Sequence, residues 1–447
     1  MAMVVKNNMS AISTLNTLNK NSSALSKSLE KVSSGMKINN AADDASGYAI
    51  SERMRVQIRS LDQANQNTQN GNSMMKVAEG AVSSTVDILK TLKEKVINAA
   101  NDTNTDSDRQ TIQKELDQSV DQIDDNANIT FNGKYLVDGS HNSKVVTTCT
   151  HLTNESLATN TATGSAMTAL KSRTNESLNI HSTDNVTISF VKQGRTYTTS
   201  FSIGGQSLEA VINASSTAKN GTETLKDAQI KFETTGGGAS SAYIGKDRAG
   251  NSVYTADNGN ALTIQATGTG TNNQISGFTI SITDNTGKIN KSANAVLDNF
   301  SESIRAENES DDNSMVLQVG TKANQAIKVG LTDMRSTALG LKGTDGQTLN
   351  VSTQVKANAA INVLDSAIQK ALDQQTTIGS VESRLSYTSS NLTTASENVQ
   401  ASESTIRDAD MAKEMTNYTK NNVLLQAAQS MLAQANQNSS AVLSLLQ

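Results

Sequence analysis

The sequence predicts a mainly α-helical protein in which the N- and C-terminal arms form long helical hairpins or coiled coils, with a β-rich domain inserted in the middle. Apolar residues recur at steps of three and four in both arms, roughly residues 4–128 and 347–446. The 447 residues include no Pro, the commonest helix breaker, and only 3% are aromatic, so one large globular core is not expected. Each arm must therefore bury its apolar stripe against the other arm or against a neighbouring molecule.

The first helix of the N-terminal arm is expected to end near Gly35, which tolerates the left-handed backbone of a helix stop. The next helix should begin at Asp43 and Asp44, because carboxylates favour the positive end of the helix dipole. Few large side chains occur in residues 1–31, which predicts that this end is disordered in the isolated monomer. The apolar stripe of the first helix consists of Met9, Ile12, Leu15, Leu18, Leu25 and Leu29.

The second helix becomes strictly periodic past residue 72, with the alternation of three and four that is typical of a coiled-coil seam. A turn over residues 101–107 then leads into a shorter helix that returns antiparallel, with Asp106 or Ser107 as its cap. The main apolar seam residues of this arm are Met75, Val82, Leu89, Leu92 and Val96.

The C-terminal arm keeps this alternation over residues 357–406, which at ~1.5 Å per residue predicts a helix of ~75 Å. Gln374, Thr388 and Ser402 interrupt its seam, and such polar residues usually fix register at some cost in stability. Its main apolar seam residues are Leu364, Ile378, Val381, Leu385, Leu392 and Val399. After a break at residues 407–410, a last amphipathic helix carries Leu424, Ala428, Met431, Ala435, Val442 and Leu445.

The middle of the chain shows the alternation of β-strands. Residues 186–191 and 196–203 are joined through Gly194 and predict a hairpin, and residues 314–320 and 325–331 predict another just before the second arm. Thr and Ser faces that look exposed predict a small surface domain. Weaker strands are expected at residues 228–233, 262–266 and 278–283.

The composition excludes several classes of function. The net charge of −5 comes with well-mixed signs, so no basic patch is available for nucleic acid. No run of ~18 apolar residues could span a membrane, and the start of the chain lacks the features of a cleaved secretory signal. Cys149 cannot form an internal disulfide, and the histidines, His141, His151 and His181, are expected in loops without metal-ligand spacing. No catalytic, cofactor or metal site is predicted.

Several long motifs then point to one family. Residues 32–54 read VSSGMKINNAADDASGYAISERM, and residues 404–415 read STIRDADMAKEM. Further motifs are TFNGKYL at 130–136, LQVGT at 317–321, and QSMLAQANQ at 429–437 followed by VLSLL. Together these closely resemble the pattern of bacterial flagellin, and the resemblance covers both arms but not the middle.

The resemblance implies a non-enzymatic structural subunit that polymerises into the flagellar filament, the propeller for swimming motility. Its inner assembly would use the apolar residues of the first and last helices named above. Residues 1–40 and 405–447 would form an inner helical coiled-coil domain, residues 41–140 and 314–404 an outer helical bundle with a β-hairpin, and residues 141–313 a variable, surface-exposed β-rich domain.

The partners implied by the resemblance are further copies of the chain in an open helical homopolymer, an export chaperone, the filament cap and the hook-junction proteins. The filament is extracellular, and export through the flagellar (type III) secretion channel needs no cleaved signal peptide. This export route agrees with the lack of secretory-signal features at the start of the sequence. No cofactor, nucleic acid or membrane is implied.

One departure from the family concerns the vertebrate innate flagellin receptor. Flagellins that this receptor recognises well carry an Arg and a Leu where this chain aligns Thr91 and Lys95, although Glu115 matches the acidic contact of the family. Arg and large apolar residues usually dominate interfaces. The resemblance therefore predicts weak activation of this receptor.

Two alternatives remain open at this point. A hook-filament junction protein would share the helical ends. Another extracellular coiled-coil protein, such as an adhesin, would place one heptad arm beside a binding domain, but this does not explain the second arm that closes the chain. An enzyme within the middle would need a motif such as HExxH, which the sequence lacks.

Overall fold

The computed structural model describes residues 8–214, 219–220, 223–224, 228–233, 243–256, 259 and 261–445. The chain forms two compact units. The first unit consists of Met1–Thr68, Gln318–Gln325 and Tyr387–Gln447, and the second of Gln69–Leu317 and Ala326–Ser386. Two long helices, α2 (Ala45–Ala99) and α6 (Gln354–Arg407), contribute to both units.

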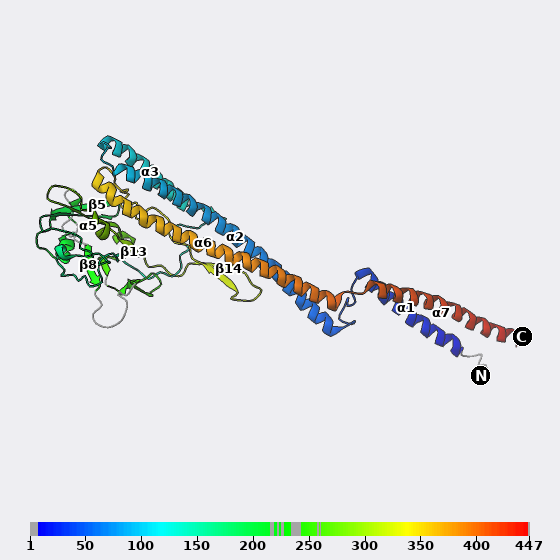
Figure 1. Ribbon diagram of the computed structural model, residues 1–447. Coiled ribbons are helices and arrows are strands. Elements are labelled where there is room, and N and C mark those ends of the chain that lie inside the picture. The colour runs from blue at the N-terminus through cyan, green and yellow to red at the C-terminus, as the bar shows by residue number, and fades with distance from the viewer. Residues whose placement is uncertain are drawn as a thin grey trace. The chain divides into compact units, whose positions relative to one another are not determined.

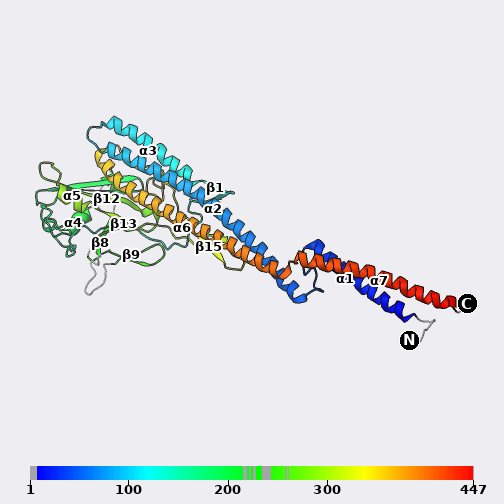
Figure 2. The ribbon, with the colours of Figure 1, turned by 45° about the vertical axis from the view of Figure 1, so that its right-hand side comes forward.

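The first unit contains the terminal helices α1 (Met9–Ser34) and α7 (Met411–Leu445), which lie side by side in Figures 1 and 2. The prediction of a left-handed stop is confirmed, because α1 ends at Gly35 with a φ of 71°. The expectation of a disordered N-terminal end is wrong for residues 8–31. They are helical because α7 of the same chain supplies the contacts that an isolated helix lacks.

Hydrogen bonds fix α1 and α7 as an antiparallel pair. The side-chain amide of Asn8 donates to the Ala435 carbonyl oxygen (3.2 Å), and that of Asn21 donates to the Leu424 carbonyl oxygen (3.3 Å). Residues late in α1 thus meet residues early in α7. The remaining cross-links are Asn421 Nδ2 to Ser28 Oγ (3.2 Å) and Lys31 Nζ to Glu414 Oε1 (3.9 Å).

The start of α2 follows the prediction in part. Asp44 Oδ1 accepts hydrogen bonds from the backbone N–H groups of Ser46 (3.1 Å) and Gly47 (3.0 Å), so Asp44 caps the helix. Asp43 instead accepts from two backbone N–H groups of the preceding loop. One carboxylate therefore shapes the loop and the other begins the helix.

Helices α2 and α6 lie side by side and run antiparallel in Figures 1 and 2. In the second unit Lys93 of α2 forms an ion pair with Asp365 of α6. In the first unit Ser389 Oγ of α6 donates to Asn65 Oδ1 of α2 (2.7 Å), and Leu61 packs in a cluster with Leu392. Of the polar seam residues, Gln374 is buried, Thr388 is half-buried and Ser402 is exposed.

Helix α3 (Asp106–Ala127) returns along α2 as predicted, but its cap is neither Asp106 nor Ser107. The cap is Thr105, whose hydroxyl accepts from the Asp108 N–H while the Asp108 carboxylate accepts from the Thr105 N–H. This reciprocal capping box satisfies two N–H groups, which a cap one residue later could not do. The side chain of Arg109 closes the α2–α3 turn by donating to two backbone carbonyl oxygens within it.

Residues 332–351, called the return segment below, lie against α3 and α6. Gln374 Oε1 of α6 accepts from the N–H (3.2 Å) and hydroxyl (2.7 Å) of Thr332, so this seam residue binds the return segment. Polar side chains of α3 bind the rest of it. These contacts are Asp124 with the Ser336 N–H and hydroxyl (both 2.8 Å), Asp121 with Lys342 (3.0 Å), Asp117 with the Thr348 hydroxyl (2.5 Å), and Gln113 with the Leu349 carbonyl oxygen (2.9 Å) and Val351 N–H (2.7 Å).

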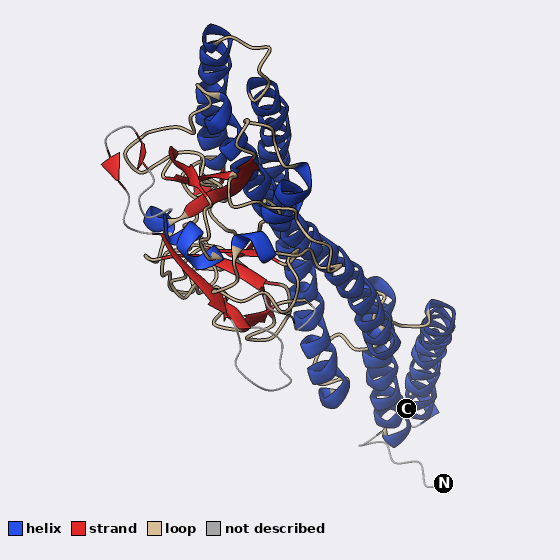
Figure 3. Ribbon diagram, turned by 60° about the vertical axis from the view of Figure 1, so that its left-hand side comes forward, coloured by secondary structure: helices blue, strands red, loops and turns tan. Residues whose placement is uncertain are grey.

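Most strands lie in the middle of the chain, and Figure 3 shows them gathered beside the long helices. One sheet has the order β13-β3-β11-β8 and another β12-β4-β5-β6-β7, while β1-β2, β9-β10 and β14-β15 are two-stranded. The strands are β1 (Thr130–Phe131), β2 (Lys134–Tyr135), β3 (His151–Asn154), β4 (Asn185–Lys192), β5 (Arg195–Ser202), β6 (Lys219–Asn220), β7 (Glu223–Thr224), β8 (Ala228–Glu233), β9 (Tyr243–Lys246), β10 (Ser252–Tyr254), β11 (Ala261–Ala266), β12 (Ile275–Thr283), β13 (Ser301–Ile304), β14 (Met315–Gln318) and β15 (Ala326–Val329), with short helices α4 (Leu208–Asn213) and α5 (Lys291–Leu297).

Both predicted hairpins and all three weaker strands are confirmed. In the β4–β5 hairpin Lys192 pairs with Arg195, which leaves Gln193 and Gly194 as a two-residue turn with positive φ at both positions. A side chain at Gly194 would lie 2.4 Å from the Gln347 carbonyl oxygen. Glycine is therefore required there by both the turn and the close approach.

The expectation that Thr and Ser faces are exposed is wrong at several positions. Thr153, Ser189 and Thr263 are buried. The Ser303 hydroxyl donates to Thr153 Oγ1 (2.7 Å), and Ser189 Oγ lies 3.1 Å from Thr198 Oγ1, so hydroxyl groups bind one another across strands instead of water.

One residue of the middle also lies elsewhere than predicted. His151 is not in a loop but is buried in β3, where its Nδ1 lies 3.1 Å from the Cys149 carbonyl oxygen. The half-buried Cys149 packs against the core and accepts a hydrogen bond at Sγ from Gln265 Nε2 (3.1 Å). Short strands with irregular ends hide such positions from a periodicity argument.

Candidate functional site

The α1–α7 pair uses a heptad face of which the sequence analysis named only part. Along α1, half-buried or buried residues recur every seven positions in two rows, which alternate by three and four. One row is Ala11, Leu18, Leu25 and Val32, and the other is Thr14, Asn21 and Ser28. Along α7 the matching rows are Tyr418, Leu425 and Leu432, and Glu414, Asn421, Ala428 and Ala435.

The predicted assembly residues divide between this heptad face and a second, exposed face. Leu18, Leu25, Ala428 and Ala435 belong to the heptad rows and are at least half-buried. The others described are exposed, with Met9 67% and Met431 62% accessible. The exposed set from the prediction is Met9, Ile12, Leu15, Leu29, Leu424 and Met431, whereas the side chains of Val442 and Leu445 lie outside the described residues.

The exposed apolar set, called the outer face below, also includes residues that the sequence analysis did not name. These are Met411, Met415 and Val423 of α7. Clusters of exposed large apolar side chains on a folded chain are uncommon and usually mark an interaction site. The α1–α7 pair therefore covers its heptad face within the chain and leaves these other apolar side chains exposed.

The residues predicted for the outer bundle seam are nearly all buried. Val399 is half-buried, and every other member is 9% accessible or less. The buried members are Met75, Val82, Leu89, Leu92, Val96, Leu364, Ile378, Val381, Leu385 and Leu392. These positions stabilise the fold and do not offer a surface to a partner.

The predicted receptor region lies on α2 and α3 of the second unit. Thr91 and Lys95 are one turn apart on α2, and Lys95 Nζ forms an ion pair with Glu115 Oε1 of α3 at 3.0 Å. The Thr91 hydroxyl donates to the Asp87 carbonyl oxygen of its own helix (3.0 Å). The structure thus brings Lys95 and Glu115 together, so the acidic side chain already has a cationic partner.

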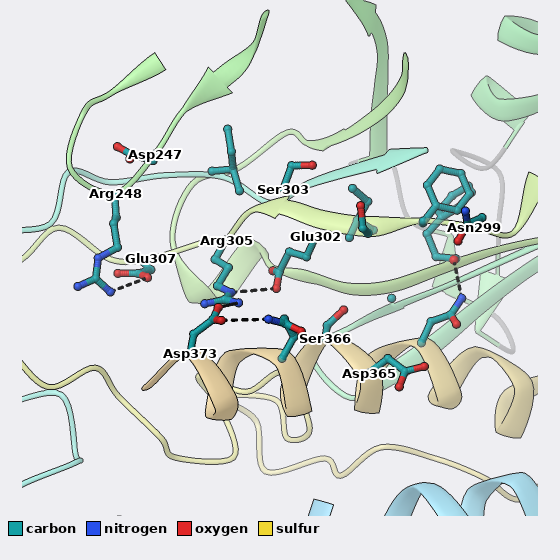
Figure 4. A pocket seen from close by; sticks show the side chains of 18 of the residues that line it. Asp247, Arg248, Asn299, Glu302, Ser303, Arg305, Glu307, Asp365, Ser366 and Asp373 are labelled. Carbon is teal, nitrogen blue, oxygen red and sulfur yellow. Dashed lines mark hydrogen bonds and ion pairs between the residues drawn. The ribbon is translucent and has the colours of Figure 1, made fainter. Parts of the chain in front are cut away.

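A groove of about 750 Å³ lies between β13 and α6 in the second unit. Figure 4 shows Glu302 and Arg305 on one wall and Asp365, Ser366 and Asp373 of α6 on the other. Arg305 bridges the walls, with Nε 3.4 Å from Glu302 Oε2 and Nη2 2.6 Å from Asp373 Oδ2. The groove therefore marks where the β-rich middle is tied to the helix.

Asp298 at this groove predicts a pH effect on stability. Burial raises its pKa from 3.8 to about 7, although the Ile280 N–H donates to its Oδ1 (3.2 Å). Between these two pKa values the unfolded chain releases a proton that the folded chain keeps, so stability falls as pH rises through this range. Asp298→Asn should remove this dependence and stabilise the protein above neutral pH by about 1–4 kcal/mol.

Urea unfolding of both proteins at about pH 5 and about pH 8 measures this difference. The control is Asp311→Asn, which changes an exposed carboxylate of the same unit. Equal pH dependence in wild type and Asp298→Asn would contradict the assignment.

The described part of the chain contains no group of three or more His, Cys, Asp or Glu side chains placed to hold a metal ion. Among the helices over the same residues, none combines the length and the apolar character needed to cross a membrane.

Comparison with known proteins decides the family. The N-terminal helical region of bacterial flagellin matches residues 5–142, and the C-terminal helical region matches residues 361–446. A flagellin of Clostridium tyrobutyricum is 34% identical over 436 residues, which cover 97% of this chain and 99% of that protein. The chain belongs to the bacterial flagellin family. A flagellin of Bacillus subtilis strain 168 is 29% identical over 464 residues, which cover 99% of this chain and all of that protein.

This flagellin is accordingly a structural subunit of the extracellular flagellar filament, which serves motility, and not an enzyme. The crystal structure of a flagellar hook associated protein-3 from Legionella pneumophila is also similar, with 17% identity, a TM-score of 0.32, and 78% of this chain and 97% of that chain covered. A likeness this distant carries no argument about function, whereas the full-length identity to flagellins favours the filament subunit over a junction protein.

Proposed function

We propose that the subunit joins the filament through the outer face of α1 and α7, which packs against the terminal helices of neighbouring copies. The observation that supports this is the exposure of Met9, Ile12, Leu15, Leu29, Leu424 and Met431 while the heptad face is already covered within the chain. Burying one such side chain contributes about 1.5–3 kcal/mol. One buried side chain does not offset the cost of association, but several of these six buried at once do. Burying several at once requires contacts with more than one neighbour, which favours assembly between many copies.

Substitution of the outer face tests this proposal. The double variant Ile12→Ser, Leu15→Ser should keep the helix content of the monomer, because both side chains are exposed there. Its elongation from filament seeds should slow by at least about tenfold, since two buried apolar contacts are lost per subunit. Far-ultraviolet circular dichroism and electron microscopy measure the two effects.

The matched control is Asn16→Ser, which changes an exposed polar residue on the same helix. It should elongate like wild type. Elongation of the double variant at the wild-type rate would show that the outer face is not the assembly surface.

The remaining partners of this subunit follow from its family. We propose that it is carried by an export chaperone, leaves the cell through the flagellar secretion channel without a cleaved signal peptide, and meets filament cap and hook-junction proteins. Residues 141–313 would serve as the variable surface domain between the inner part (1–40, 405–447) and the outer part (41–140, 314–404). The net charge of −5 of the whole chain, with well-mixed signs, fits a polymer without nucleic acid or membrane partners.

We further propose that this flagellin activates the vertebrate innate flagellin receptor weakly. Lys95 neutralises Glu115 at 3.0 Å, and Thr91 offers a short side chain where an Arg anchor would be favourable. The double variant Thr91→Arg, Lys95→Leu should raise receptor activation by about tenfold or more, because it supplies an anchor and frees the carboxylate.

A reporter-cell assay with monomeric protein measures this difference. The control is Lys90→Leu, because the exposed Lys90 lies in the same helix and forms its ion pair with Asp87 of that helix. Full potency of the wild-type protein would refute the proposal.

A further inference from the structure

In the first unit the α1–α7 pair meets the adjoining ends of α2 and α6, and this meeting point, called the joint below, is an ordered structure. The connection from α1 to α2 lies against the connection from α6 to α7. The Lys37 N–H donates to the Arg407 carbonyl oxygen (2.7 Å), and the Ala409 N–H donates to the Gly35 carbonyl oxygen (2.9 Å). Met36 and Asp408 form the antiparallel bridge between these bonds. The two connections therefore hold each other and do not act as separate linkers.

The side chain of Arg407, the last residue of α6, occupies the centre of this joint. It is 5% accessible. Its Nη1 donates to Glu52 Oε1 (2.6 Å) and Ser51 Oγ (3.5 Å), and its Nε donates to Met36 Sδ (3.2 Å). The guanidinium also lies 5.5 Å from the centre of the Tyr48 ring. One side chain thus contacts the first connection and the first two turns of α2.

The chemistry of these contacts requires an arginine. A planar guanidinium can place two N–H groups on different acceptors and its face on a ring at the same time, whereas a lysine ammonium cannot. The hydrogen bond from Arg407 lowers the pKa of Glu52, as expected for a carboxylate whose charged form is stabilised by a guanidinium. Helix α7 begins only a few residues beyond Arg407, so this side chain lies at the point where α7 and its partner α1 leave the joint.

We infer that Arg407 is a positioning residue for filament assembly: it fixes the direction of the α1–α7 pair within the first unit and so presents the outer face in the orientation that a growing filament accepts. The inference rests on the proposed function, which makes the outer face the assembly surface. It adds that orientation, as well as apolar character, is needed for elongation.

The chain offers a matched control for Arg407. Arg55 contacts the same carboxylate, with Nη1 3.6 Å from Glu52 Oε1, and also pairs with Glu403 of α6 at 3.5 Å. Its side chain is 45% accessible, however, and it contacts neither connection. Arg55→Met removes one positive charge beside the same carboxylate, but from α2, and it leaves the contacts of Arg407 with Met36, Tyr48 and Ser51 in place.

The experiment uses the full-length chain with Cys149→Ser, and with Glu397→Cys and Lys420→Cys as spin-label sites on exposed positions of α6 and α7. Pulsed electron paramagnetic resonance measures the distance between the labels, and seeded elongation measures assembly. Wild type and Arg55→Met should give one narrow distance distribution and equal elongation rates. Arg407→Met should broaden the distribution and slow elongation by at least about tenfold. Arg407→Lys should give a distribution width and an elongation rate between those of wild type and Arg407→Met.

Glu52→Gln provides a second variant if Arg407→Met fails to fold, because it removes one charge and keeps the shape of the side chain. It should broaden the distribution and slow elongation about threefold. If Arg407→Met folds and gives a narrow distance distribution with wild-type elongation, the inference is overturned. If Arg407→Met does not fold, the same result in Glu52→Gln overturns it. Failure of the wild type to elongate, by contrast, would overturn the proposed function itself.

Discussion

Replacing Lys370 by Ala should destabilise the second unit by about 2–4 kcal/mol, because it removes one of the two cations that offset the charge of Glu302 and leaves the Ala338 carbonyl oxygen without its donor. Lys370 lies fully inside the protein on α6, and its Nζ donates to the Ala338 carbonyl oxygen of the return segment (2.7 Å). Burial lowers the pKa of Lys370 and raises that of Glu302 on β13, while the attraction between the two opposes both shifts. The cluster thus joins β13, α6 and the return segment.

Hydrogen exchange read by mass spectrometry is the suitable measurement, because unfolding of a chain with two units need not be a single transition. Peptides from β13 and the return segment should lose protection in Lys370→Ala. The control is Lys93→Ala, which removes the partly exposed ion pair between Lys93 of α2 and Asp365 of α6, the helix that carries Lys370. It should cost no more than about 1 kcal/mol. Equal protection in the two variants would contradict a role for the buried charge.

Removing every residue after Arg407 should abolish filaments and leave the second unit folded. The truncation deletes α7, and with it half of the heptad face and the exposed residues Leu424 and Met431. Helix α1 would then lose its intrachain partner and unfold, because an isolated helix of this kind is unstable in water. The seam of α2 and α6 in the second unit makes no use of α7.

Electron microscopy after addition of seeds tests the first part of this prediction, and circular dichroism tests the second. The full-length chain, treated in the same way, is the control. Normal filaments from the truncated chain would refute the role of α7, and loss of the helix signal from α2, α3 and α6 would refute the independence of the second unit.

The long helices were predictable because their seams are apolar and strictly periodic. Ten of the eleven seam residues named from the sequence are buried, and α6 begins and ends within a few residues of the predicted range. The β4–β5 hairpin was predictable for a similar reason, since a Gly between two alternating runs favours one turn geometry.

The heptad face of α1 was not predictable by the same reasoning, because one of its two rows is polar. Thr14, Asn21 and Ser28 look like solvent positions in a search for apolar stripes, yet Asn21 bonds to the backbone of α7. Their spacing of seven was the available signal. The search instead selected Ile12 and Leu15, which face away from α7 and form the outer face.

The joint and the groove could not be predicted because they unite residues that are distant in the sequence. Arg407 and Glu52 are 355 positions apart, and the sequence motifs around each identify a family but not a contact. Lys370 and Glu302 likewise come from different elements, so only the folded chain shows that the Glu302 side chain, 7% accessible, lies near the buried Lys370.

The pairing of α1 with α7 also has a consequence for the order of folding. Its hydrogen bond between Asn21 and Leu424 joins residues 403 positions apart, whereas Asn126 and Ser84 of the α2–α3 hairpin are 42 apart. Closing a loop costs more entropy as it lengthens, so local hairpins form early and distant pairs late. The terminal pair should therefore close last. A subunit would display an aligned outer face only once the rest of the chain is in place, which delays polymerisation until folding is complete.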